Sequence, residues 1–300
     1  MRILIAALAL GGLASICSPR ACASPSGNAE QPKVVALMAA VGDRLTVVRQ
    51  KRSVGTHLDP YVRTPLRVPG QSLNTAVLRG LDSGIEQEYP EAERVLLTWN
   101  PPPELQARLD DIKGSGRDNA LLDALIDHLR AAPARAGWDR IEVIVPRYRH
   151  YEARGMGTKL QGLGVYVQPL GGGRDMIDAS LPPGDTEDGG QRVVNPNTGE
   201  VVRSKIFVAP YMFFERIALD ARTLTVLKRQ QQFDANKYHD PMAAVNDVAD
   251  IMSPAQLAEK ISDLAERSAF QAIRGKGATV EVSVPKVAAP PPAGATSAAR

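Results

Sequence analysis

Apolar and polar residues separate most clearly over residues 206–227 of this 300-residue chain, where two apolar runs flank a short polar break. The runs are rich in aromatic and β-branched residues, which fit the pleated surface of a β-sheet. The break at residues 220–223 is too short for a crossover connection, and its Asp and Thr side chains can bond the backbone of a turn. The pattern therefore predicts an antiparallel hairpin at the centre of a sheet, covered on at least one face.

Shorter apolar runs predict the other strands, and apolar residues at spacings of three and four predict the helices. Gly42 and Asp43 predict a turn that sends the second strand back beside the first. Gly162 and Gly164, inside a predicted strand, indicate a bulge or a close backbone approach. The expected strands cover residues 34–39, 44–50, 94–99, 140–145, 160–170, 192–194, 200–202 and 279–284, and the expected helices cover residues 72–89, 104–112, 118–132, 241–252 and 253–275.

Other segments are rich in residues that interrupt regular structure. Residues 51–70 are polar and contain three prolines, so we expect a loop there. Residues 171–199 are dense in Gly, Pro, Asp and Asn, a composition typical of a long loop that is either functional or disordered. Asp118 and Ser253 stand where an N-cap is needed, so each is expected to begin a helix.

Helix and strand alternate over residues 72–146, which favours some parallel pairing. We therefore expect a single domain of the α/β (or α+β) class over residues 33–285. Its mixed β-sheet has the strongly apolar hairpin at the centre and helices packed mainly on one face. With 44% hydrophobic and 23% charged residues, the chain has enough apolar material to form such a core.

The first 23 residues have the form of a secretory signal peptide. Arg2 precedes an apolar run over residues 3–16, and Ala21-Cys22-Ala23 is a small-x-small cleavage site. We therefore expect an exported protein, periplasmic or secreted, with residues 24–32 as a flexible lead-in and residues 286–300 as a disordered Ala/Pro-rich tail. No later apolar run reaches the ~20 residues that a membrane-spanning helix needs.

The two cysteines, Cys17 and Cys22, lie inside this leader. The residues before them do not match the Leu-small-small pattern of a lipid-modified cysteine, so we expect no lipid anchor. Cleavage after Ala23 leaves a chain without thiols, which excludes disulfides, Cys nucleophiles and Cys metal ligands. The full chain has a formal charge of +3, and loss of the two leader arginines leaves +1, which argues against a nucleic-acid partner.

Cofactor and metal motifs do not emerge from the sequence. The four histidines have no pair at metal-ligand spacing, so no metal site is expected. The glycine pairs and the run at residues 171–173 do not open a helix after a strand, so no phosphate-binding loop or cofactor is expected. The acidic residues of 175–188 lack the spacing of a calcium loop.

Residues 42–46, Gly-Asp-Arg-Leu-Thr after an apolar strand, are similar to the first block of the GDSL-type esterases. In that family the residue after Asp is the nucleophilic Ser, but here it is Arg44, a permanent cation that cannot attack an ester. The family's later Asp-x-x-His block is also missing, since Asp234 lies five residues before His239. We therefore assign no catalytic residue and interpret the segment as a turn.

A basic segment after the predicted strand 140–145 is the candidate ligand-binding site. Ligands of open α/β sheets tend to lie beyond the carboxyl ends of strands, and cations there suit an anionic or sugar-containing ligand. The alternative is a solvated loop whose cations pair with acids such as Glu152. The candidate residues are Arg147, Tyr148, Arg149, His150 and Arg154.

The alternation of strands and helices ends in IALDARTLTVL, residues 217–227, an Asp-containing turn between two strands. This pattern resembles small envelope domains such as the amino-terminal domain of TolB and the lipoprotein activators of penicillin-binding proteins. The resemblance implies a domain that binds other proteins and has no catalytic residues. We expect an exported, non-catalytic binding or accessory protein of the cell envelope, whose partner is another envelope protein or an anionic envelope ligand. This hypothesis predicts an exposed apolar or basic patch near residues 147–150 and no deep polar cleft.

A periplasmic hydrolase is the alternative, in which a histidine meets a carboxylate in one pocket. The histidines considered for this role are His57, His150 and His239. A purely structural envelope protein is a third possibility.

Overall fold

The computed structural model describes residues 31–50, 61–68, 70–153, 156, 159–168, 191–204, 206–240 and 251–275. From Pro32 onward they belong to one compact unit with an eight-stranded sheet and four helices packed on it. The mixed β-sheet and the α/β class are as the sequence predicts. The sheet consists of β1 (Val34–Ala39), β2 (Arg44–Gln50), β3 (Tyr61–Arg67), β4 (Glu93–Thr98), β5 (Arg140–Pro146), β8 (Leu163–Gln168), β11 (Phe207–Asp220) and β12 (Val226–Ala235). The helices are α1 (Ser72–Glu88), α2 (Pro103–Asp111), α3 (Ser115–Arg130) and α5 (Pro254–Ile273), with a short 3-10 helix, η1 (Pro133–Gly137). Two small hairpins are β6 (Tyr151–Glu152) with β7 (Lys159–Leu160), and β9 (Gln191–Val194) with β10 (Val201–Ser204).

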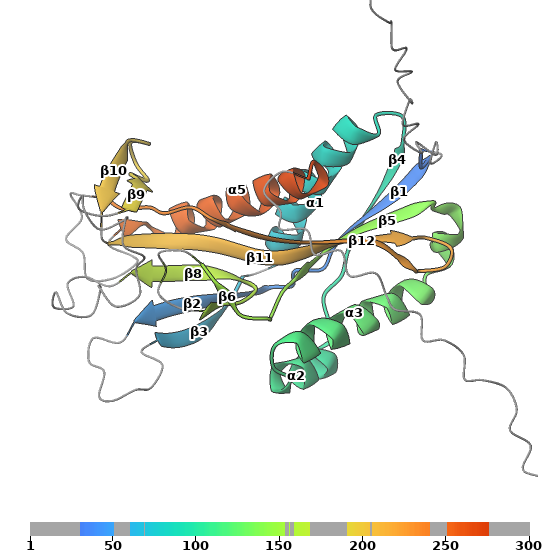
Figure 1. Cartoon of the computed structure of the whole chain (residues 1–300), viewed down its shortest axis with the longest axis horizontal. Helices are drawn as coiled ribbons and strands as arrows, with labels where there is room; N and C mark the ends of the chain where they lie inside the picture. Colours follow the sequence, from blue (N-terminus) through green and yellow to red (C-terminus); the bar gives the residue numbers. More distant parts are fainter. Residues whose placement is uncertain are drawn as a thin grey trace, which may run out of the picture. The chain divides into compact units, whose positions relative to one another are not determined.

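The long strand β11 organises the sheet (Figure 1). It pairs antiparallel with β12, with β8 through residues 207–212, and with β5 through residues 214–220. Residues 211–219 also pair with β12, so β8 and β5 must share the opposite edge, end to end. The predicted apolar hairpin is thus confirmed, with β11 buried along nearly its whole length and β12 more exposed beside it.

The sheet consequently has two halves that β11 joins. In one half β1 lies parallel between β5 and β4, and in the other β2 lies between β8, to which it is parallel, and β3, to which it is antiparallel. Because β5 and β8 run in the same direction along β11, β1 and β2 also run in one direction. A break in the sheet therefore separates β1 from β2 and β5 from β8.

The predicted turn at Gly42 and Asp43 is therefore wrong, because β2 does not run back beside β1. Ala40 still donates its N–H to Ile144 of β5, and the next N–H, of Val41, goes to the side chain of Asn74 instead of to a strand. Gly42 has a φ of 81°, a conformation that glycine adopts without strain. The chain therefore leaves the line of β1 at this point, crosses the break in the sheet, and continues as β2 in the same direction.

The predicted loop over residues 51–70 is also partly wrong, since residues 61–67 form β3. β3 is an edge strand of the sheet, and most of its residues are exposed. Because neither face of the strand is buried, its sequence lacks the alternation of apolar and polar residues that predicts a strand. Pro65 lacks an N–H and is tolerated because an edge strand has a free side.

Helices cover both faces of the sheet, and not mainly one as expected (Figure 1). On one face α1 and α5 bury their apolar sides against β1, β8 and β11. On the other, α3 and residues of α2 pack against β1, β5 and the end of β11. Alternate residues of β1 point to the two cores, so a short apolar strand serves both.

Helix α5 begins as predicted, because Ser253 forms a capping box with Gln256. Asp118 does not begin α3, whose N-cap is Gly114. The carboxylate of Asp118 instead accepts the N–H groups of Tyr148 and Arg149 beyond the end of β5. The side chain thus holds the segment after β5 against the first turn of α3.

A buried ion pair holds α5 to the sheet. Arg216 of β11 donates through Nε to Glu142 of β5 at 2.9 Å, and Glu142 is also 2.6 Å from Nε of Arg140. Arg216 Nη1 donates to the carbonyl oxygens of Ala272 and Ile273, where α5 ends. A cation that binds the last carbonyls of a helix satisfies orphan acceptors and opposes the helix dipole.

Several expectations fall outside the described residues. These are the signal peptide, most of the lead-in, residues 171–190 of the expected loop at 171–199, residues 241–250 of the expected helix at 241–252, the strand at 279–284 and the tail. No helix among the described residues is both long and apolar enough to cross a membrane.

Candidate functional site

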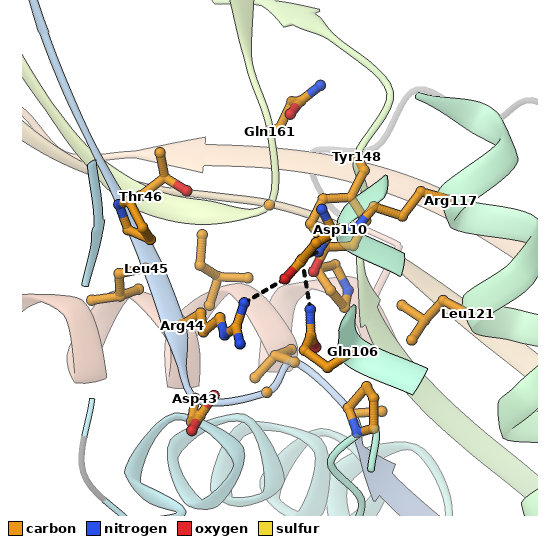
Figure 2. Close-up of a pocket in the computed structure, with 18 residues that line it drawn as sticks. Asp43, Arg44, Leu45, Thr46, Gln106, Asp110, Arg117, Leu121, Tyr148 and Gln161 are labelled. Atoms are coloured by element: carbon orange, nitrogen blue, oxygen red, sulfur yellow. Dashed lines mark hydrogen bonds and ion pairs between the residues drawn. The ribbon is translucent and has the colours of Figure 1, made fainter. Parts of the chain in front are cut away.

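A cavity of about 160 Å³ lies at the break between the two halves of the sheet (Figure 2). Its lining includes residues just beyond the carboxyl ends of the parallel strands β1, β4 and β5 and residues at the starts of β2 and β8. Ligands of open α/β sheets bind at such carboxyl ends. At ~30 Å³ per water molecule, the volume holds about five waters or a small polar group. The lining residues are Ala40–Thr46, Pro65, Pro101, Gln106, Asp110, Arg117, Leu121, Pro146, Tyr148 and Gln161–Leu163.

Two structural devices keep the cavity open. On the β1 side, Asn74 of α1 is fully buried, accepts the N–H of Val41 at 3.0 Å and donates to Asn100 Oδ1 at 2.8 Å. It therefore joins the start of α1 to the ends of β1 and β4. On the β5 side, the chain leaves the sheet after Arg147 and returns at Gly162, and these two residues bond to Phe213 of β11 through the backbone.

The predicted close approach near Gly164 is confirmed at the edge of this cavity. A Cβ on Gly164 would lie 2.1 Å from the carbonyl oxygen of Thr46 and 2.6 Å from the hydroxyl of Tyr211. That hydroxyl donates to the carbonyl oxygen of Gln161 at 3.3 Å, and burial raises the pKa of Tyr211. The phenol is thus a neutral structural donor beneath the cavity.

The carboxylate of Asp110 is the polar centre of the cavity (Figure 2). Its Oδ2 accepts from Arg44 Nη1 at 2.7 Å, and its Oδ1 accepts from Arg117 Nη2 at 2.8 Å and from Gln106 Nε2 at 2.9 Å. Partial burial raises the pKa of Asp110, but the hydrogen bonds from Arg44 and Gln106 and the charges of both arginines outweigh it and hold that pKa below its usual range. The carboxylate is therefore ionised at neutral pH.

The two guanidinium groups come from opposite sides of the break. Arg44 is the first residue of β2, and Arg117 lies in the first turn of α3. Arg117 also stacks over the ring of Tyr148 at 3.7 Å, and its buried Nε has no hydrogen-bond partner among the residues that the structure describes. Two cations thus converge on one carboxylate, and Arg67 of β3 lies directly across from Arg44 in the strand register. The cavity lining as a whole contains two arginines and two aspartates, Asp43 and Asp110, so its formal charges balance.

Of the predicted ligand-binding residues that the structure describes, only Tyr148 lines this cavity. Arg147 is buried, where it contacts Glu215 at 3.0 Å and Asp118 at 3.4 Å. Glu215 in turn accepts two hydrogen bonds from Arg229, so the guanidinium of Arg147 is part of an interior ion-pair network.

The other members of the predicted segment lie elsewhere. Arg149 and His150 are exposed, and Arg154 lies outside the described residues. The basic patch near residues 147–150 therefore consists of Arg149 and His150, and its role in binding stays a prediction.

Sequence reasoning missed the polar residues that line this small cavity. Arg44, Gln106, Asp110 and Arg117 lie on three separate elements and have no motif in common. The available signal was the placement of Arg44 directly after an apolar strand and its Gly-Asp step. That signal predicts a strand end, but not which distant side chains meet it.

Of the histidines considered for a hydrolase, the two that the structure describes, His150 and His239, do not line the cavity. His150 is exposed, and His57 lies outside the described residues. His239 is nearly buried, its Nδ1 has no hydrogen-bond partner, and desolvation lowers its pKa although the charge of Asp240 opposes this. Within the described ranges, no cluster of three or more His, Cys, Asp or Glu could hold a metal ion.

Comparison with known proteins adds little to these observations. No family model and no curated protein sequence matches the chain. Among solved structures, the chain is similar to the crystal structure of a Xanthomonas campestris protein of the DUF330 family. The alignment covers 83% of this chain and 85% of that one, with 9% sequence identity and a TM-score of 0.28.

Proposed function

We propose that this chain is an exported, non-catalytic binding or accessory protein of the cell envelope, and that its cavity binds an anionic group. One observation carries the proposal: Arg44 and Arg117 reach the cavity from opposite sides of the sheet break and together hold a carboxylate. Arginine is well suited to this role because its planar fork matches the geometry of oxyanions and keeps its charge at any physiological pH.

The chemistry of the lining supports binding over hydrolysis. The described residues that line the cavity include no histidine, serine or cysteine. The carboxylate of Asp110 accepts three donors and has a lowered pKa, so it is a poor general base. The leader sequence of residues 1–23 supports the proposed export.

The binding proposal is tested by calorimetric titration of the purified protein with acetate, succinate and inorganic phosphate, and with glucose as an uncharged control. We expect saturable binding of at least one anion and none of glucose. Arg44→Gln removes one charged hydrogen-bond donor, which typically contributes about 1.5–3 kcal/mol, so affinity should fall roughly 10- to 150-fold.

Arg149→Gln is the matched control, because it removes the same charge from an exposed residue of the predicted basic segment. Under the proposal it leaves anion affinity unchanged. Loss of binding in Arg149→Gln but not in Arg44→Gln would instead place the site on the basic segment. Absence of binding for every anion would contradict the proposed function.

A further inference from the structure

The helix that supplies Asp110 is weakly held. Helix α2 has nine residues, below the length at which isolated helices are stable, and Leu109 is its only buried residue. Its last two residues, Asp110 and Asp111, place negative charge at the negative end of the helix dipole, which is unfavourable. The position of α2 therefore depends on Leu109, on the partly buried Leu105, which packs against the same core, and on the contacts of Asp110.

Those contacts are of a kind that an anion from solution can replace. The side chains of Arg44 and Asp110 are 36% and 40% exposed, and ion pairs at such exposure stabilise only weakly. Each arginine takes a different oxygen of the carboxylate, Oδ2 for Arg44 and Oδ1 for Arg117. A carboxylate of a ligand at this position would make the same two contacts.

We propose that Asp110 is an internal competitor for the ligand, that the ligand binds through a carboxylate which replaces Asp110 between Arg44 and Arg117, and that α2 moves away when this happens. The inference rests on the proposed function and adds the ligand's chemical class and the moving element. Gln106 and Asp110 both line the cavity from α2, so displacement of this helix enlarges the cavity on that side.

Substitution of neighbouring carboxylates tests the competition. Asp110→Asn and Asp111→Asn change the net charge equally on adjacent residues, but only Asp110 contacts the arginines. Asp111 is exposed at the end of α2. If Asp110 occupies the site about nine-tenths of the time, its removal raises the apparent affinity for acetate or succinate roughly tenfold. Asp111→Asn should bind these anions as the wild type does.

Hydrogen exchange of residues 103–111 tests the movement. Saturating succinate should accelerate exchange of these amides in the wild-type protein, and Asp110→Asn should show the faster exchange without any ligand. Circular dichroism confirms that each variant is folded. Unchanged exchange on succinate binding would overturn the moving helix.

The outcomes separate this inference from the function on which it rests. If Arg44→Gln weakens anion binding but Asp110→Asn and Asp111→Asn change it equally, the anion site is supported. The proposed competition by Asp110 is then overturned. A gain in affinity of Asp110→Asn for inorganic phosphate, but not for acetate or succinate, overturns the carboxylate class. No anion binding in any variant overturns both proposals.

Discussion

Helices α1 and α5 pack so closely that two glycines of α1 leave no room for a side chain. A Cβ on Gly80 would lie 2.0 Å from the carbonyl oxygen of Glu266 and 2.9 Å from Cβ of Ala269. A Cβ on Gly84 would lie 2.9 Å from Cβ of Ile273. Carbon atoms require ~3.5–4.0 Å, so Gly80→Ala must separate the two helices or bend one of them.

The expected magnitude follows from two opposing effects. Alanine in place of glycine inside a helix stabilises it by about 1 kcal/mol. Overpacking of a close interface costs about 1–3 kcal/mol, and the cost for Gly80 lies at or above the upper end because the obstacle is backbone. We expect Gly80→Ala to lower the free energy of unfolding by about 2 kcal/mol or more, and Gly84→Ala by less, since the side chain of Ile273 can adjust.

Urea unfolding followed by circular dichroism measures these differences from the midpoint and slope. Gly137→Ala is the control, because a Cβ there meets nothing within 4 Å. It should be neutral or slightly stabilising. A Gly80→Ala protein as stable as the wild type would refute the close approach of α1 and α5, and so the arrangement of that face of the sheet.

Three further predictions concern buried polar groups. Arg216→Met should lower stability by about 3–5 kcal/mol in urea unfolding, because it leaves the buried carboxylate of Glu142 with one partner fewer, and the double variant with Glu142→Leu should recover part of the loss. Asn74→Leu should cost about 1–3 kcal/mol in the same assay, because the buried N–H of Val41 loses its acceptor, and a neutral result would show that Asn74 does not hold the break. Desolvation lowers the pKa of His239, so the folded state binds fewer protons than the unfolded state just below pH 6.5. The free energy of unfolding should therefore fall as the pH drops below 6.5, by at most ~1.4 kcal/mol per pH unit, and His239→Gln should remove this part of the slope.

Local patterns predicted the elements whose residues carry their own signal. The apolar hairpin of β11 and β12, the cap at Ser253 and the close approach at Gly164 all depend on neighbours in sequence or on the size of one residue. Strand β3 escaped prediction because most of its residues are exposed. The direction of β2 was wrong because Gly42 and Asp43 indicate a change in the backbone, but not whether the strand reverses or continues.

The candidate site could not be predicted for a related reason. In the sequence, Arg44, Asp110 and Arg117 are charged residues without a shared motif. In the structure they are partly exposed, and the break in the sheet brings them together. Conversely, Arg147 looked like a ligand-binding cation because it follows a strand, yet the fold places Glu215 and Asp118 beside it. Whether a cation is free for a ligand depends on tertiary partners that sequence spacing does not specify.

The most direct test of the account is a nuclear magnetic resonance titration that follows the arginine Nε–H signals as succinate is added. Signals of Arg44 and Arg117 are assigned by their loss in Arg44→Gln and Arg117→Gln. The account predicts saturable shifts of both, and none for Arg149. Shifts confined to Arg149, or no saturable shift of Arg44 and Arg117, would contradict an anion site at the break in the sheet.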